Sequence, residues 1–413
     1  MSAEPKAQPL ARERWLAIVG IGEDGIRGLS DEAKRLIASA EIVFGGKRHL
    51  ELATPLINGS AEPWPSPFDS SFAAVRAHAG RAVCVLASGD PFLFGVGATL
   101  ARSFSPDEMQ VVPAPSAFSL AAARLGWALQ DVETVSLHGK ALALIRRHLH
   151  PGQRILCLTS DGEAPARIAA LLCSLGFGPS HLTVLEALGG PNERVGSARA
   201  DAFDIENINP LNVLAIECES TREALVVSLA PGLPDEAFEH DGQISKREIR
   251  ALTLSALAPR SGEILWDIGA GSGSIGIEWM LADPSLRAIA VEVNPERAAR
   301  IRRNADALGV PGLQVVEGVA PAALAGLDHP HAIFIGGGAS DPGVLDAAIA
   351  ALPPAGRLVV NAVTLETEAL LIARHAGLGG TLTRLSVERA APVGGMTAWR
   401  PALPVTQWSW VKP

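Results

Sequence analysis

The 413 residues predict an α/β protein of two to three domains. Short apolar runs alternate with helix-like stretches along most of the chain, a pattern typical of parallel sheets covered by helices on both faces. Two of these runs lead directly into glycine-rich turns, at 19–25 and at 268–273. Between them, the stretch 230–242 combines prolines, glycines and acidic residues, which predicts a domain boundary near residue 232.

Composition and charge argue against several other classes of protein. Hydrophobic residues make up 48% of the chain and charged residues 19%, which is too apolar for a disordered protein. No apolar run reaches the roughly 18 residues of a membrane-spanning helix, and the polar N-terminus lacks the apolar core of a signal peptide. The net charge of −9 argues against a nucleic-acid surface, which needs clustered Lys and Arg. We therefore expect neither a nucleic-acid nor a membrane partner.

The cysteines are scattered, without any C-x-x-C pair, at Cys84, Cys157, Cys173 and Cys218. This spacing fits neither a zinc site nor the disulfide framework of a secreted protein. We expect reduced thiols, a cytoplasmic location and no bound metal, because no His, Cys or acidic cluster has metal-ligand spacing.

The first half begins with residues 1–14, which we expect to form a flexible tail. The apolar run 15–20 then predicts a buried strand that ends in glycines. Ser30 precedes two acidic residues, so it is expected to cap a helix over 30–40 by accepting from a free backbone N–H. Further strands are expected at 42–44, 82–86, 155–158 and 213–216, and a helix at 118–125.

The second half begins with an amphipathic helix and its leading segment at 241–257. A strand at 263–267 leads into the second glycine-rich turn, and a helix follows at 274–281. Later strands are expected at 288–293, 313–316, 332–335 and 357–361. In a doubly wound sheet the carboxyl ends of such strands meet at one edge, where ligands bind.

The second glycine-rich turn carries the strongest chemical signal. Glycines permit a tight turn and close approach to a ligand, and the following helix start offers unpaired N–H groups. Gly271, Gly273 and Gly276 also satisfy the dinucleotide pattern G-x-G-x-x-G, so a nicotinamide-dependent oxidoreductase stays an alternative. Asp267 favours a cationic ligand, because a carboxylate beside a pyrophosphate is electrostatically costly. Glu292 ends the next strand, where an acidic residue binds ribose hydroxyls.

This D-x-G-x-G-x-G turn with its acidic strand end resembles class I S-adenosylmethionine-dependent methyltransferases. The resemblance implies a Rossmann-like doubly wound fold with one bound S-adenosylmethionine. The cofactor contacts that we expect are Gln243, Ser245, Asp267, Gly269, Ala270, Gly271, Gly273, Ser274, Glu292, Gly318, Val319 and Gly336.

The glycine run 336–338 stands where amino-group methyltransferases carry an Asn/Asp-Pro-Pro-aromatic motif. Three glycines leave space for a bulky, flat substrate, which favours methylation of carbon or oxygen. Substrate carboxylates need cationic partners, and Arg is the better carboxylate clamp. The expected substrate contacts in this half are Gly337, Gly338, Lys246, Arg247, Arg250, Arg389 and Arg400, with a solvated side chain as the alternative for each cation.

A second set of motifs lies in the first half. The segment 87–95 (ASGDPFLFG) follows one apolar run, and 112–117 (VPAPSA) follows another. A Gly-Asp-Pro turn alone is ordinary turn chemistry. Together with the turn at 19–25, in this order and spacing, the segments resemble the tetrapyrrole methylase family. The resemblance covers nearly all of 15–230 and continues through the segment 45–50 (GGKRHL).

The tetrapyrrole methylase resemblance implies two α/β lobes, about 15–114 and 115–231, with S-adenosylmethionine bound between them. The implied cofactor contacts are Ser88, Gly89, Asp90, Pro91, Ser116 and Ala117, and the implied substrate contacts are Gly22, His49 and His138. A loop histidine is more often a structural hydrogen-bonding residue. Glu23 and Asp24 depart from the Gly-Pro or Pro-Gly of the family, on the substrate side.

The fusion of these two families, with the second domain at 232–413, resembles the fused precorrin methyltransferases of cobalamin biosynthesis. That resemblance implies methylation of C5 by the first half. It implies methylation of C15 and loss of CO₂ from the C12 acetate by the second half, giving precorrin-8X. We expect two S-adenosylmethionine sites, a precorrin substrate and a homo-oligomer, either dimer or tetramer. No catalytic residue is singled out. A non-catalytic tetrapyrrole-binding module stays an alternative beside the oxidoreductase.

Overall fold

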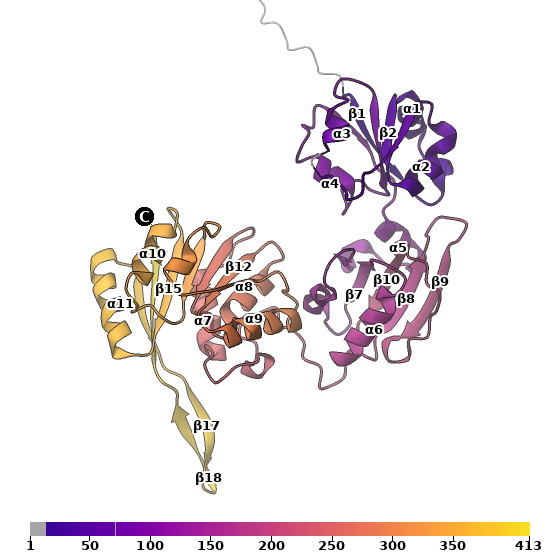
Figure 1. The fold of residues 1–413 in the computed structure, drawn as a ribbon. Coiled ribbons are helices and arrows are strands. Elements are labelled where there is room, and N and C mark those ends of the chain that lie inside the picture. Colours follow the sequence, from indigo (N-terminus) through magenta and orange to yellow (C-terminus); the bar gives the residue numbers. More distant parts are fainter. Residues whose placement is uncertain (1–13, 71) are drawn as a thin grey trace, which may run out of the picture. The chain divides into compact units, whose positions relative to one another are not determined.

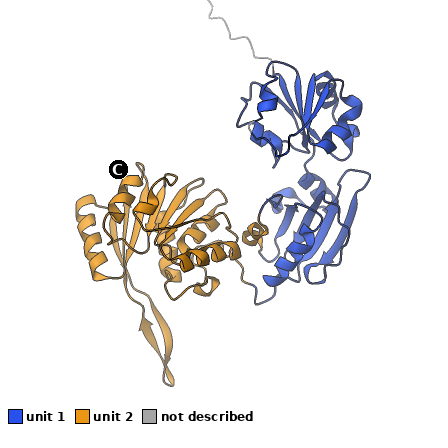
Figure 2. Cartoon of the chain, in the orientation of Figure 1, with its two compact units in different colours: residues 1–140, 150–224 blue, residues 141–149, 225–413 orange. Residues whose placement is uncertain are grey.

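The computed structural model describes residues 14–70 and 72–413. The chain divides into two compact units, residues 1–140 with 150–224 and residues 141–149 with 225–413 (Figure 2). The expected flexible tail lies outside the described residues except for Arg14. The domain boundary that the sequence predicts near residue 232 lies close to Leu225, where the main part of the second unit begins.

The first lobe of unit 1 is the indigo and purple part of the ribbon in Figure 1. It is a parallel sheet with strand order β3-β2-β4-β1-β5. Alternate side chains of β1 enter different cores, with Val19 beside α1 and Ile18 on the opposite face. Ser30 caps α1 as predicted, since its Oγ accepts from the N–H of Ala33 at 3.2 Å. The elements are β1 (Leu16–Ile21), α1 (Asp31–Ser39), β2 (Ile42–Gly45), α2 (Lys47–Ala53), β3 (Ser60–Pro63), α3 (Ala73–Arg76), β4 (Val83–Ser88), α4 (Val96–Leu100) and β5 (Met109–Val112).

The order of these strands creates a switch point. After β1 the chain crosses to β2 on one side, and after β4 it crosses to β5 on the other. The carboxyl ends of β1 and β4 therefore border the place where an open parallel sheet binds its ligand.

The second lobe of unit 1 has the strand order β6-β7-β10-β8-β9. Among its described strands, β6 and β7 pair in parallel, whereas β10 pairs antiparallel with β7 and β8, and β8 antiparallel with β9. The expectation of parallel sheets is wrong here, because β8 and β9 are joined by a short hairpin without a crossover helix. The elements are α5 (Ala117–Leu125), β6 (Glu133–Ser136), β7 (Arg154–Leu158), α6 (Ala164–Ser174), β8 (His181–Glu186), β9 (Arg194–Arg199) and β10 (Asn212–Glu217).

Unit 2 has one large sheet with strand order β13-β12-β11-β14-β15-β19-β16, and all neighbours from β13 to β15 are parallel. This is the predicted doubly wound fold, with its switch point between β11 and β14. Strand β19 runs antiparallel to β15 and β16, which the sequence did not predict. The elements are α7 (Arg247–Leu257), β11 (Ile264–Ile268), α8 (Ser274–Ala282), β12 (Arg287–Glu292), α9 (Pro295–Ala307), β13 (Gln314–Glu317), β14 (Ala332–Ile335), α10 (Val344–Ala351), β15 (Arg357–Ala362), α11 (Leu365–Leu378), β16 (Thr381–Leu385) and β19 (Val405–Val411).

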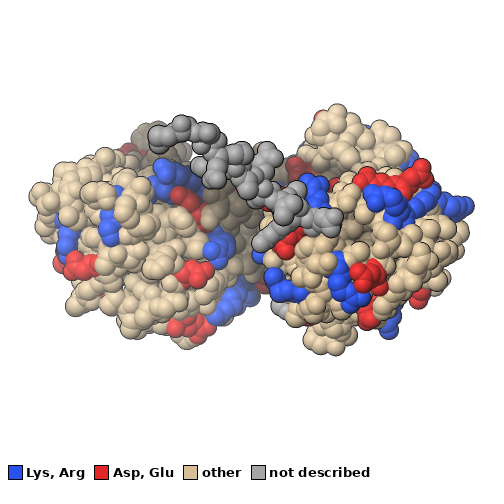
Figure 3. Space-filling model, turned by 90° about the horizontal axis from the view of Figure 1, so that it is seen from above, with Lys and Arg blue, Asp and Glu red and all other residues tan. Residues whose placement is uncertain are grey.

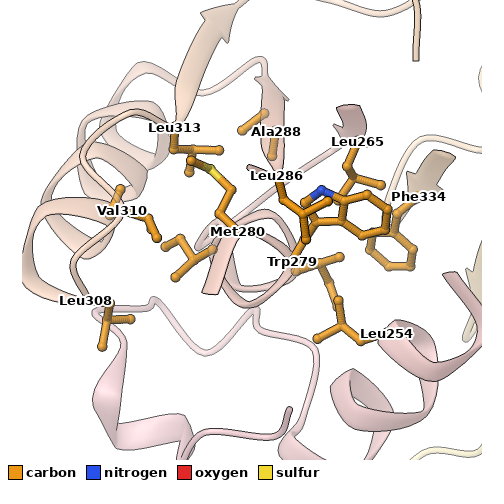
Figure 4. Close-up of a cluster of buried hydrophobic side chains, with 14 of the residues drawn as sticks. Leu254, Leu265, Trp279, Met280, Leu286, Ala288, Leu308, Val310, Leu313 and Phe334 are labelled. Carbon is orange, nitrogen blue, oxygen red and sulfur yellow. The ribbon is translucent and has the colours of Figure 1, made fainter. Parts of the chain in front are cut away.

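The core of unit 2 fixes the helix that follows the glycine-rich turn. Trp279 of α8 is fully buried beside Leu254, Leu265 and Phe334, which come from α7, β11 and β14 (Figure 4). Its indole N–H donates to the carbonyl of Arg287 at 3.1 Å, so the buried ring leaves no unpaired donor. Because α8 is held in this way, the turn before it has a defined place at the end of β11.

A hairpin of β17 (Glu388–Val393) and β18 (Met396–Pro401) extends from unit 2 as a separate ribbon (Figure 1). On the described part of the face in Figure 3, Lys and Arg lie interspersed with Asp and Glu, without a continuous patch of one sign. No helix among the described residues is long and apolar enough to cross a membrane. Within the same residues, no group of three or more His, Cys, Asp or Glu side chains could hold a metal ion.

Candidate functional site

A pocket of about 970 Å³ opens at the carboxyl ends of β11, β12, β14 and β15 in unit 2. This is the switch point of the sheet. Its walls contain most of the residues that the sequence predicts for the cofactor, namely Gln243, Ser245, Gly269, Ala270, Gly271, Ser274, Glu292, Gly318, Val319 and Gly336. Of the predicted substrate contacts, the walls contain Lys246, Gly337, Gly338 and Arg389.

The glycine-rich turn requires its glycines. Gly269, Gly271 and Gly273 have φ values of +68°, +60° and +75°, in the left-handed region that other residues rarely adopt. A Cβ on Gly269 would lie 2.7 Å from the carbonyl oxygen of Gly337. The turns after β11 and β14 therefore approach each other closely, and the backbone of both turns lines this part of the pocket. Gly273 does not line the pocket, and a Cβ there would meet Ile301 at 2.7 Å.

Glu292 is a fixed carboxylate in the pocket wall. Its Oε2 accepts from the N–H of Gly271 at 2.8 Å, and its Oε1 accepts from the N–H of Asn294 at 3.0 Å. Both oxygens keep a further lone pair. A carboxylate held in this way suits the paired hydroxyls of a ribose, as expected for the acidic residue at this strand end.

Asp267 lies behind the turn and does not line the pocket. Its Oδ2 accepts from the N–H of Gly276 at 3.0 Å, whereas Oδ1 is buried without a hydrogen-bond partner among the described residues. Burial raises the pKa of Asp267 to about 7, against the effect of the Gly276 N–H, and the charge of Glu292 adds to the rise. Asp267 thus holds the start of α8, and in its ionised form it places a negative charge beneath the turn.

Arg250 has a different role from the one the sequence predicts. Its side chain is 0% exposed, and its guanidinium pairs with Glu278 at 2.7 Å and Asp235 at 2.9 Å. It also donates to the carbonyl of Leu233 and lies over the ring of Phe238. Because protein partners occupy the guanidinium, Arg250 stabilises the helix packing and does not face the pocket.

The remaining predicted cations differ in their positions. Lys246 lies 3.7 Å from Asp235 and lines the pocket, and Arg389 lines it while paired with Glu248. Arg247 and Arg400 are not among the residues of the pocket wall. The Arg389–Glu248 pair is exposed, and such pairs are worth little in stability, so Arg389 can exchange its partner for a ligand at small cost. Lys246 can do the same because Asp235 keeps Arg250 as its closer cation.

Asn361 is a pocket residue that sequence reasoning missed. It stands at the end of β15, donates from Nδ2 to Oγ1 of Thr253 at 2.9 Å, and accepts at Oδ1 from Nε2 of Gln407 at 2.9 Å. A polar residue at the end of an apolar strand was the available signal. Arg297 was also missed; it lines the pocket and binds Asp241 at 2.8 Å, which ties the leading segment of α7 to α9.

In unit 1 the turns after β1, β4 and β5 converge. The N–H of Gly89 donates to the carbonyl of Ile21 at 3.1 Å, and the carbonyl of Gly89 accepts from Ala114 at 3.2 Å. A Cβ on Gly20 would lie 1.9 Å from the oxygen of Gly89, and Gly89 itself has a φ of +53°. The predicted cofactor loop Ser88–Pro91 therefore lies at the switch point of this sheet.

His49 contacts the same loop. Its Nε2 lies 2.8 Å from Oγ of Ser88, while Nδ1 is buried without a partner among the described residues. Burial lowers the pKa of His49 to about 4, helped by the charge of Arg48, so the ring is neutral at pH 7. Arg48 in turn pairs with Glu23, one of the two residues that depart from the family pattern. Gly22 is in the same turn.

The other predicted residues of unit 1 have local structural partners. Asp90 accepts at Oδ1 from the N–H of Phe92 at 2.8 Å, and Ser116 caps α5 by accepting from Ser119 at 3.0 Å. His138 lies in the second lobe, with Nδ1 3.1 Å from the carbonyl of Thr159. Ala117 is the first residue of α5.

Two family models match the chain, one to each half. Residues 16–204 match the family described as Tetrapyrrole (Corrin/Porphyrin) Methylases, and residues 236–412 match the Precorrin methyltransferase domain. The chain is therefore a methyltransferase built from two methyltransferase folds, and S-adenosylmethionine is the donor that its families use. The two matches confirm the predicted fold class. They exclude the two alternatives that the sequence left open, a nicotinamide-dependent oxidoreductase and a non-catalytic tetrapyrrole-binding module.

Similar proteins narrow this class. A Sinorhizobium sp. protein named precorrin-6Y C(5,15)-methyltransferase [decarboxylating] is 61% identical over 412 residues, covering 100% of both chains. A Mycobacterium tuberculosis (strain H37Rv) protein of the same name is 43% identical over 401 residues, covering 96% of this chain and 100% of that one. The chain belongs to the precorrin-6Y C5,15-methyltransferase (decarboxylating) family, as its motifs predicted.

A solved structure is also similar to part of the chain. The C-terminal domain of precorrin-6Y C5,15-methyltransferase from Rhodobacter capsulatus is 49% identical, with a TM-score of 0.43. It covers 45% of this chain and 100% of that chain.

Proposed function

We propose that the chain methylates a precorrin at C5 in unit 1 and at C15 in unit 2, each with its own bound S-adenosylmethionine. Unit 2 also removes CO₂ from the C12 acetate, and the product is precorrin-8X. One observation carries the proposal of two sites: each unit has a glycine-constrained turn at the switch point of a parallel sheet. The family membership supplies the substrate class.

In unit 2 the cofactor lies along the pocket wall. Glu292 binds the ribose hydroxyls, and the backbone of Gly269–Gly271 borders the amino-acid portion. Asp267 favours the positive charge of the ligand from beneath the turn. Gln243 and Ser245 close over the cofactor from the leading segment of α7, and the later strand ends contribute Gly318, Val319 and Gly336.

The substrate occupies the other side of the same pocket. Gly337 and Gly338 leave room for the flat macrocycle beside the methyl group. Lys246 and Arg389 bind its carboxylates, since both cations line the pocket; Arg389 has an exposed partner in Glu248, and Asp235, the partner of Lys246, is also paired with Arg250. In unit 1, Gly22, His49 and His138 contact the substrate, and Ser88–Pro91 with Ser116 and Ala117 hold the donor.

The reaction suits sites without a strong base. An electron pair of the macrocycle carbon forms the new C–CH₃ bond while the S–CH₃ bond breaks, and sulfur leaves as a neutral thioether. Such a transfer needs alignment and exclusion of water more than proton removal. The C–CO₂ bond of the acetate breaks, the conjugated macrocycle accepts the electron pair, and a proton then converts the remaining CH₂ group into a methyl group.

Assembly into a homo-oligomer is part of this proposal. The hairpin β17–β18 exposes Val393, Met396 and Trp399, at 57%, 79% and 70%. Apolar side chains on a ribbon with unpaired edges favour contact with a second copy. Sedimentation should give a dimer or tetramer whose mass falls in Trp399→Glu, and a monomeric wild-type chain would contradict it.

Mass spectrometry of the product tests the function. With precorrin-6Y and S-adenosylmethionine, the full chain should add two methyl groups and release one CO₂. Gly89→Val should abolish the C5 methyl group, because a side chain there meets the carbonyl oxygen of Pro115 at 2.8 Å. Glu292→Ala should reduce C15 methylation and CO₂ release together. A wild-type chain that transfers one methyl group or none would overturn the proposal.

A further inference from the structure

The turn that follows β4 exposes three large apolar side chains in succession. Phe92, Leu93 and Phe94 are 46%, 40% and 51% exposed, whereas the apolar residues of β4 itself are buried. Single exposed apolar residues are common on protein surfaces, but a contiguous group indicates a binding surface. The three residues directly follow Ser88–Pro91, the loop proposed to hold the methyl donor.

The backbone holds this group in a constrained conformation. Asp90 accepts at Oδ1 from the N–H of Phe92 at 2.8 Å, and its carbonyl accepts from Leu93 at 3.2 Å. Phe94 has a φ of +56°, a left-handed conformation that bulky residues rarely adopt. A glycine would fit this backbone more easily. Backbone strain at a bulky residue is typical of functional positions, where the side chain itself is needed.

The ring of Phe94 contacts Phe118 in the second lobe and lies close to the ammonium group of Lys140. It packs edge-on against Phe118 of α5, with 6.0 Å between ring centroids and 76° between planes. Phe118 directly follows Ser116 and Ala117. The Nζ of Lys140 lies 5.7 Å from the centroid of Phe94, and no carboxylate pairs with this lysine within residues 14–70 and 72–413.

We propose that Phe92, Leu93 and Phe94 form an apolar platform for one face of the tetrapyrrole in unit 1, and that Lys140 binds one of its carboxylates. This inference rests on the proposed function and extends it to residues not assigned there. A conjugated macrocycle offers a flat apolar face with a rim of carboxylates. The apolar side chains can stack on the macrocycle face, and Lys140 can form an ion pair with a carboxylate at its rim. The macrocycle then lies beside the methyl donor.

Kinetics of the full chain test the platform. Phe94→Gly should raise the KM for precorrin in C5 methylation by about tenfold, because an aromatic contact is lost. Because Phe94 also packs on Phe118 beside Ser116 and Ala117, the affinity for S-adenosylmethionine in unit 1 is measured separately, and the rise in KM for precorrin should exceed any loss of that affinity. Glycine accepts the positive φ, so this variant should fold. Thermal unfolding checks that expectation.

Lys140 provides a second variant that cannot fail for lack of packing, because its side chain is exposed. Lys140→Gln should raise the same KM severalfold, and Lys140→Arg should restore it, since a cation is retained. Phe68→Ala is the matched control. Phe68 is 50% exposed in the same lobe, but its ring contacts are with Trp64 and Phe72 and not with Phe94 or Phe118.

The outcomes separate this inference from the proposed function. An unchanged KM in Phe94→Gly and Lys140→Gln, with C5 methylation intact in the wild type, would overturn the platform alone. An equal rise in Phe68→Ala would also overturn it, as a general effect of lost apolar surface. A wild-type chain without C5 methylation would overturn the proposed function itself, and the platform with it.

Discussion

Gly271 and Glu292 are joined by a hydrogen bond of 2.8 Å from the backbone N–H of the glycine to Oε2 of the carboxylate. The bond links the turn after β11 to the end of β12, two neighbouring parallel strands. The turn and the proposed ribose-binding carboxylate therefore form one rigid element, with the left-handed backbone of Gly271 directing its N–H toward Glu292.

Loss of this carboxylate should weaken the cofactor site of unit 2. We expect Glu292→Ala to reduce S-adenosylmethionine affinity there by about 1–3 kcal/mol, the cost of losing hydrogen bonds to a charged group. Calorimetric titration measures this change. Glu317→Ala is the matched control, because Glu317 is the register partner of Glu292 on β13 and does not line the pocket. Equal affinities in wild type and Glu292→Ala would contradict the assignment.

Affinity at the same site should rise with pH. The pKa of Asp267 is raised to about 7 by burial, so the group is mostly protonated at pH 6 and mostly ionised at pH 8. The cationic cofactor favours the ionised form, and affinity should be about tenfold lower at pH 6 than at pH 8. Asp267→Asn should remove this part of the pH dependence. An identical profile in both proteins would refute the role of Asp267.

We expect substitution of Arg250 to lower stability and substitution of Lys246 to weaken substrate binding. Arg250→Ala leaves the carboxylates of Asp235 and Glu278 without their buried cation, which should cost about 3–5 kcal/mol of unfolding free energy. Lys246→Ala should change stability by less than about 1 kcal/mol but raise the KM for precorrin at C15. Thermal unfolding and steady-state kinetics of both variants provide the comparison. A stable Arg250→Ala variant with a raised KM for precorrin would instead show that Arg250 contacts the substrate.

Unit 1 should lose stability in mild acid. The pKa of His49 is lowered from 6.5 to about 4 by burial. Between these two pH values the imidazole is protonated in the unfolded chain but neutral in the folded chain. The free energy of unfolding should fall by about 2–3 kcal/mol as pH falls from about 6.5 to about 4. Hydrogen exchange of the β1 and β4 amides reports this opening. His49→Gln should show a smaller fall, and an unchanged fall would exclude the histidine as its cause.

The strands of the doubly wound sheets could be predicted because they are buried on both faces and appear as continuous apolar runs. The run 332–335 coincides with β14. By contrast, β9 is an exposed edge strand whose sequence, RVGSAR, has little apolar content. Its hairpin with β8 therefore gave no signal, and the antiparallel pairs of the second lobe were missed.

Site residues could be predicted where a local motif positions them. The glycine turn at 269–273 and the acid at 292 depend on neighbours in sequence. Arg250 depends on Asp235 and Glu278, which only the folded unit brings together, so its burial was not predictable from an amphipathic pattern. Asn361 was missed for the same reason, because Thr253 and Gln407 that orient it come from α7 and β19.

The number of S-adenosylmethionine molecules bound by the intact chain tests the central claim most directly. Calorimetry should give two sites per chain in the wild type. Gly89→Val should leave the site of unit 2, and Gly271→Val should leave the site of unit 1, because each glycine has a positive φ that valine rarely adopts. At Gly89 a Cβ would also meet the carbonyl oxygen of Pro115 at 2.8 Å. A single site in the wild type, unaffected by Gly89→Val, would contradict a methyltransferase centre in each unit.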